Sequence, residues 1–102
     1  IVGTPGSMAP EQLLGEDVDG RADLYAVGVL MYECLSGQPP FSAPSPIALI
    51  AKILSAPVPS LSERNNEVPP AVSGLVTRLL AKDRADRPRH AAELLELLAE
   101  LM

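Results

Sequence analysis

The sequence has one cysteine, few cations and no long hydrophobic run, and each shortage excludes a class of protein. A single cysteine cannot form a disulfide within the chain, which fits a reducing cytosol. Eight Lys and Arg against 13 Asp and Glu give a net charge of −5. Nucleic-acid binding needs clustered cations, so we expect no nucleic-acid partner.

The longest apolar stretch, Leu24 to Tyr32, covers about nine residues, whereas a helix that spans a bilayer needs roughly 20. The sequence does not open with a signal peptide. Its first residue is Ile rather than Met, so we expect it to be part of a longer protein. We expect that protein to be cytoplasmic, with any membrane anchor outside this segment.

Hydrophobic periodicity predicts helices and no strands. Residues 22–36 are apolar on nearly all sides, which is typical of a helix buried inside a larger protein. Residues 70–81 carry an apolar stripe at helical spacing. Further helices are predicted over 11–14, 47–54 and 89–102, with Pro-rich loops between the helices. We therefore expect an all-α fold of about five helices, forming one domain or part of one.

The spacing also predicts which side chains face the core. Cys34 is expected to be a small buried hydrophobe rather than a reactive or metal-binding thiol. Gly37 is a stop signal for the helix that contains Cys34. The other inward residues are expected to be Ile47, Ile50 and either Ala51 or Leu54; Val72, Leu75, Val76, Leu79 and Leu80; and Ala91, Leu94, Leu95, Leu98 and Leu101.

Several short motifs follow one another along nearly the whole chain. Each is weak alone: Glu11 is a carboxylate near a helix start, and Arg87 has the character of a surface charge. In order, the motifs are Gly3-Thr4-Pro5, Ala9-Pro10-Glu11, Asp23-x-Tyr25-x-x-Gly28, Gly37-x-Pro39-Pro40-Phe41, Leu79-Leu80-x-x-Asp83 and Arg87-Pro88. Together they resemble the C-terminal part of the large lobe of a serine/threonine protein kinase of the bacterial, eukaryotic-like type. Gly-Thr-Pro before Ala-Pro-Glu favours the serine/threonine class over the tyrosine class.

The resemblance implies that residues 1–102 form a partial kinase domain. They would hold the end of the activation segment, the substrate-docking loop and the following helices of the large lobe. Thr4 would support a catalytic aspartate and lysine that this sequence does not contain. Ser7 departs from the family, since a tyrosine usually occupies that place. The residues of the loop that would bind the protein substrate are Gly3, Thr4, Pro5, Gly6, Ser7 and Met8.

The resemblance also suggests roles for four charged residues. Glu11 would pair with Arg87, whose planar guanidinium suits a bidentate bond to a carboxylate. Asp23 would accept hydrogen bonds from the backbone of the catalytic loop, as a positioning residue and not a proton acceptor. Glu33 would meet a basic residue of the substrate, as an acid so placed does in some relatives, or else have a solvated or capping role.

One further residue invites a metal hypothesis. His90 is the only histidine and lies at a predicted helix start. No Cys or Asp stands at ligand spacing from it, so no metal site is expected in this chain.

Four family motifs are missing: Gly-x-Gly-x-x-Gly, Val-Ala-x-Lys, His-Arg-Asp and Asp-Phe-Gly. They supply the nucleotide cradle, the metal-binding acids and the base of phosphoryl transfer. We expect the parent protein to use ATP and Mg²⁺ and to move the γ-phosphate onto Ser or Thr of a protein substrate. This chain alone is expected to bind neither and to be inactive.

Two other hypotheses stay open. The parent is a pseudokinase or scaffold that serves as a protein-binding module, or the chain is an unrelated helical interaction domain, which requires Glu11 and Arg87 to lie far apart. For a kinase, the expected partners are a protein substrate and the rest of the kinase domain, with no membrane contact in this segment. Part of the packing partner of the 22–36 helix would lie outside this chain, so we also expect self-association, a swapped dimer or marginal stability of the isolated chain.

Overall fold

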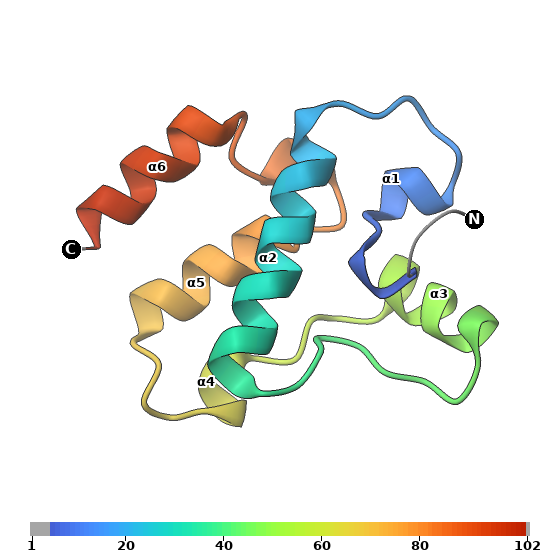
Figure 1. The fold of residues 1–102 in the computed structure, drawn as a ribbon, viewed down its shortest axis with the longest axis horizontal. Helices are drawn as coiled ribbons and strands as arrows, with labels where there is room; N and C mark the ends of the chain where they lie inside the picture. Colours follow the sequence, from blue (N-terminus) through green and yellow to red (C-terminus); the bar gives the residue numbers. More distant parts are fainter. Residues whose placement is uncertain (1–4, 102) are drawn as a thin grey trace.

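The computed structural model describes residues 5–101, and within them the regular structure is entirely helical, with no β-strand (Figure 1). The all-α prediction is therefore confirmed. The elements in order are η1 (Pro5–Ser7), α1 (Pro10–Leu13), α2 (Gly20–Ser36), α3 (Pro46–Ser55), α4 (Leu61–Arg64), α5 (Pro70–Leu79), η2 (Arg84–Asp86) and α6 (Ala91–Glu100), where η marks a short 3₁₀ helix.

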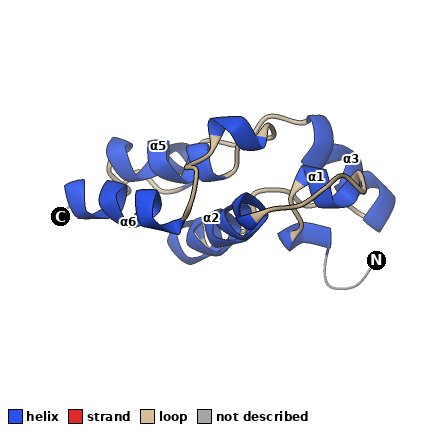
Figure 2. Ribbon diagram, turned by 90° about the horizontal axis from the view of Figure 1, so that it is seen from above, coloured by secondary structure: helices blue, strands red, loops and turns tan. Residues whose placement is uncertain are grey.

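Helix α2 is the central element. Figure 1 shows α5 and α6 on one side of it and α1 and α3 on the other, and Figure 2 shows the same division from above. The Asp19 carboxylate caps its first turn by accepting a 2.9 Å hydrogen bond from the Arg21 backbone N–H. It ends at Gly37, whose φ of 73° lies in the left-handed region that glycine adopts without steric cost. The predicted stop at Gly37 is confirmed.

Helices α2 and α5 cross at Gly28. A Cβ atom at this position would lie 2.8 Å from Leu79 Cβ and 3.1 Å from Leu80 Cδ2, so a side chain would force the helices apart. The stripe predicted for α5 does face this contact: Leu75, Val76, Leu79 and Leu80 are buried. The core therefore lies on both sides of α2. Its smaller cluster joins α2, α5 and α6 through Leu24, Leu75, Leu79 and Leu94.

Several residues that were predicted to be buried are exposed. Cys34 is exposed on α2. On α3, Ile47 is 82% exposed while Ile53, which was not predicted, is fully buried. On α6, Leu95 is 66% exposed. A helix that is apolar on adjacent sides, as α3 and α6 are, does not reveal its buried side by periodicity alone, because the neighbouring elements decide it. Ala51, Ala91 and Leu101 are also exposed, whereas Leu94 is buried as expected.

The sequence analysis did not predict α4. It lies in the Pro- and Ser-rich segment 56–69, although Ser60-x-x-Glu63 is a recognisable helix-start pattern. Side chains bond this segment to the end of α2: Tyr32 Oη donates to Pro59 O at 2.8 Å, and Asn65 Nδ2 donates to Leu35 O at 2.8 Å. Segment 56–69 is thus fixed to the end of α2 by hydrogen bonds.

Candidate functional site

The structure brings Glu11 and Arg87 together across 76 residues of sequence. Arg87 Nη1 donates to Glu11 Oε2 at 2.6 Å, and Arg87 Nη2 donates to Glu11 Oε1 at 2.8 Å. Arg87 is 1% exposed and Glu11 4%. This is the bidentate geometry that makes an arginine–carboxylate bond both strong and specific in direction. We call these two side chains the clamp.

Local sequence explains how each partner is presented. Pro10 is the first residue of α1, where its missing N–H is no loss, and Glu11 follows it. Gln12 Oε1 accepts a 2.8 Å hydrogen bond from the Ala9 backbone N–H, which holds the turn before α1. On the other side, Pro88 favours an extended backbone at Arg87, where φ is −83° and ψ is 165°. The two prolines therefore set the backbone direction of both partners.

Arg87 makes further hydrogen bonds that tie two other segments to the clamp. Its Nε donates to Ala81 O at 2.8 Å, and its Nη1 donates to Arg21 O at 3.1 Å. Nη2 also lies 3.4 Å from Lys82 O, and the guanidinium carbon stands 5.1 Å from the centre of the Tyr25 ring. The clamp thus joins α1, the start of α2 and the end of α5, and it leaves no buried polar side-chain atom unpaired within residues 5–101.

The surroundings shift the ionisation of two groups near the clamp. Burial raises the pKa of Glu11, but the hydrogen bonds from Arg87 and from its own backbone, with the charges of Arg87 and Arg84, outweigh burial and leave the pKa below its ordinary value. Burial also raises the pKa of Tyr25 to about 12. Glu11 is therefore a carboxylate at neutral pH, and Tyr25 a neutral phenol.

The predicted docking loop precedes the clamp. Gly3 and Thr4 lie outside the described residues, and Pro5 to Ser7 form the η1 turn. Ser7 is exposed and Met8 half-buried, so the loop presents a surface at this point. The η1 turn packs against both α3 and α2. Ala9, directly after the loop, is fully buried, so the end of the loop is anchored in the core.

One face of α2 is exposed and mostly apolar. It carries Asp23, Val27, Leu30 and Cys34, whose spacing of four, three and four residues places them in one row. Val27 is 37% exposed and Leu30 61% exposed. We call this row the open face of α2. It agrees with the expectation that this helix would expose an apolar patch.

The comparison with known families decides the identity. A model described as the protein kinase domain matches residues 1–97. The chain belongs to the protein kinase family.

The curated relatives are bacterial serine/threonine protein kinases. The chain is 44% identical over 88 residues to the kinase PksC of Streptomyces coelicolor, which is 85% of this chain and 16% of that protein. It is 40% identical over 95 residues to PknB of Mycolicibacterium smegmatis, which is 92% of this chain and 15% of PknB. It is 42% identical over 98 residues to RqkA of Deinococcus radiodurans, a DNA damage-responsive kinase, which is 96% of this chain and 15% of RqkA. The chain therefore spans about a sixth of the length of these kinases.

The family match and the clamp exclude an unrelated helical interaction domain, which needed Glu11 and Arg87 far apart. Two other candidate residues are placed by the structure. Glu33 is exposed on α2, and its backbone carbonyl accepts the Gly37 N–H at 2.8 Å. His90 caps α6, because its Nδ1 accepts a 3.2 Å hydrogen bond from the Glu93 N–H.

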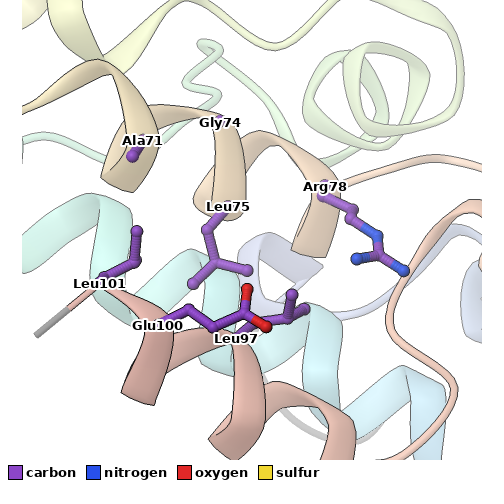
Figure 3. Close-up of a pocket in the computed structure, with 7 residues that line it drawn as sticks. All are labelled: Ala71, Gly74, Leu75, Arg78, Leu97, Glu100 and Leu101. Atoms are coloured by element: carbon purple, nitrogen blue, oxygen red, sulfur yellow. The ribbon is translucent and has the colours of Figure 1, made fainter.

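Three further features of this kinase chain concern metal binding, membrane spanning and surface grooves. Residues 5–101 hold no group of three or more His, Cys, Asp or Glu side chains that could bind a metal ion. None of the described helices is long and apolar enough to cross a bilayer. A groove of about 230 Å³ runs between α5 and α6, with Arg78 at one end and Leu101 at the other; it is lined by Ala71, Gly74, Leu75, Arg78, Leu97, Glu100 and Leu101 (Figure 3).

Sequence reasoning missed two cations beside the clamp. Arg84 donates through Nη1 to Asp17 O and so closes the loop between α1 and α2 onto η2. Lys82 reaches the end of α3. No local sequence pattern identifies a side chain that donates to a backbone carbonyl elsewhere in the chain. A proline just after a helix end does indicate that one of the last helix carbonyls lacks a backbone N–H donor and needs another.

Proposed function

We propose that this chain is the C-terminal part of the large lobe of a serine/threonine kinase that transfers the γ-phosphate of ATP to Ser or Thr of a protein. The observation that carries the proposal is the buried clamp. Glu11 and Arg87 fix the end of the loop before α1 to the closing segments of the chain. A loop held at one buried end and exposed at Ser7 suits the docking of a protein substrate.

In this proposal the loop of residues 3–8 receives the substrate segment beside the phosphoacceptor. Thr4 supports the catalytic aspartate and lysine of the upstream loop, and Glu33 offers its carboxylate to a basic substrate residue. Glu33 is available for that role because its side chain is exposed. Glu11 and Arg87 are structural: they hold the loop and take no part in the chemistry.

The open face of α2 is assigned to the rest of the kinase domain. Asp23 lies at its start, where its carboxylate would accept backbone N–H groups of the catalytic loop, and Leu30 would pack beneath them. Val27, Leu30 and Cys34 are exposed in one row on the same side of α2, and such a contiguous apolar surface supports a covering partner. Within residues 5–101 no group of three or more His, Cys, Asp or Glu side chains could hold a metal ion, so no step of phosphoryl transfer is assigned to this chain, which we expect to be inactive alone.

A kinase assay on the full-length protein tests the proposal. With ATP, Mg²⁺ and a mixed protein substrate, we expect phosphate on Ser and Thr, and a lower kcat/KM in the Glu11→Gln variant. Titration of residues 1–102 with ATP should give no saturable binding. A full-length protein that transfers no phosphate yet still binds a protein partner would replace this proposal with the pseudokinase or scaffold alternative.

A further inference from the structure

The C-terminal end of α3 has a carbonyl that the helix itself cannot satisfy. The oxygen of Ile53 would normally accept the backbone N–H of residue 57, but that residue is proline and has none. Ile53 has a fully buried side chain, so its backbone lies where water has limited access. An unpaired carbonyl here would weaken this end of α3.

Lys82 supplies the missing donor. Its Nζ donates to Ile53 O at 2.7 Å and lies 3.5 Å from Lys52 O. The same ammonium group stands 4.7 Å from the centre of the Phe41 ring, in the loop before α3. Burial lowers the pKa of Lys82 from its ordinary value. One cation therefore contacts both the segment that enters α3 and the turn that ends it.

Lys82 belongs to the same short segment as the clamp. Its backbone carbonyl lies 3.4 Å from Arg87 Nη2, and the preceding carbonyl, of Ala81, accepts from Arg87 Nε at 2.8 Å. Helix α3 in turn packs against η1 and α1. Segment 81–87 thus holds the docking loop in two ways: directly through Arg87 and Glu11, and indirectly through Lys82 and α3.

We propose that Lys82 is a positioning residue for protein-substrate binding, which acts by fixing α3 against the η1 turn of the docking loop. This inference rests on the proposed function, because it assumes that the loop receives a protein substrate. Lys82 contacts neither ATP nor the reacting atoms. Its loss should therefore weaken the binding of protein and leave the phosphoryl-transfer step intact.

The test uses Lys82→Met in the full-length kinase, with Lys82→Arg and Lys52→Met beside it. Arginine keeps donors that reach the carbonyls. Lys52 Nζ donates to Ser42 O at 2.6 Å, within the same loop-and-helix unit, so Lys52→Met is a matched control that leaves the link to segment 81–87 in place. We expect KM for the protein substrate to rise about five- to tenfold in Lys82→Met, the size of one lost buried hydrogen bond. The kcat and the KM for ATP should stay unchanged, Lys82→Arg should restore most of the binding, and Lys52→Met should resemble wild type.

Hydrogen exchange of the α3 amides gives a second readout that needs no activity. In Lys82→Met, residues 50–55 should exchange faster, while the amides of α5 keep their protection. Unchanged exchange in α3, or a fall in kcat with constant substrate KM, would overturn the inference. If the wild-type protein transfers no phosphate, the proposed function fails, and the exchange experiment still decides whether Lys82 fixes α3.

Discussion

The clamp and the open face of α2 lie in one small chain and differ in burial. The charges of the clamp are buried and paired, whereas the open face is exposed. At the clamp, Glu11 and Arg87 are almost fully buried and every donor of the guanidinium has an acceptor. On the open face, Asp23 and Leu30 are both exposed, one polar and one apolar. The clamp is a finished interaction that this chain makes with itself. In the proposed function, the open face is the surface that the rest of the kinase domain covers.

The largest expected effect comes from breaking the clamp. Arg87→Leu leaves the Glu11 charge buried without its partner, which should lower the free energy of unfolding by about 3–5 kcal/mol. Chemical denaturation at a fixed protein concentration measures this loss. Arg89→Leu is the control, because the Arg89 side chain is 80% exposed and its removal should change stability by no more than about 0.5 kcal/mol. Similar losses in the two variants would contradict the importance given to the clamp.

The next largest effect is expected at the crossing of α2 and α5. Gly28→Ala places a Cβ atom 2.8 Å from Leu79 Cβ and should cost about 1–3 kcal/mol of stability. Gly74→Ala is a matched control, since Gly74 lies within α5 and a Cβ there meets nothing within 4 Å. That variant should instead gain about 0.5–1 kcal/mol. Thermal unfolding of both variants, measured together, should therefore shift in opposite directions.

Acid should weaken the clamp. The folded pKa of Glu11 lies below its ordinary 4.5, so its stabilisation is fully present above that value. It is lost as the pH falls through the folded pKa. Unfolding measured from about pH 7 to about pH 3 should show a stability difference between wild type and Glu11→Gln that narrows in acid. A constant difference over that range would mean that folding does not lower the pKa of Glu11, and that the clamp does not favour its charged form.

A substitution on the open face is expected to change stability least, but to change self-association clearly. Leu30→Glu should convert a self-associating chain 1–102 to a monomer, because it places a charge in the middle of the apolar row. Its stability should change by no more than about 0.5 kcal/mol, as the side chain is exposed. Sedimentation velocity measures the change. Leu95→Glu, on α6, is the control and should leave association as it is; a wild-type chain that is already monomeric would remove the reason for assigning a partner here.

Sequence alone predicted the parts of this molecule whose signals are local. The stop at Gly37 and the stripe of α5 needed only backbone preference and helical period. The pairing of Glu11 with Arg87 is not local, and it was foreseen only because the order of motifs resembled a known family.

What sequence did not predict depends on packing. Ile53 rather than Ile47 is buried because α3 lies against η1 and α1, and nothing within the helix itself encodes that choice. Cys34 is a small apolar residue in an apolar run, as core residues often are, yet it is exposed on the open face. The role of Lys82 was not predicted from the sequence at all. Its partner is the carbonyl oxygen of Ile53, which lacks a backbone donor because residue 57 is proline.

The separation of 76 positions between Glu11 and Arg87 also bears on the order in which the molecule forms. A contact between such distant positions closes about three quarters of the chain into one loop, so it forms late and slowly compared with the turns of a single helix. During synthesis, Glu11 leaves the ribosome long before Arg87 does. Limited proteolysis of nascent chains stalled before and after Arg87 should show the segment around Glu11 cleaved readily in the first and protected in the second. The loop before α1 would then be made early in the synthesis of this chain and held in place late.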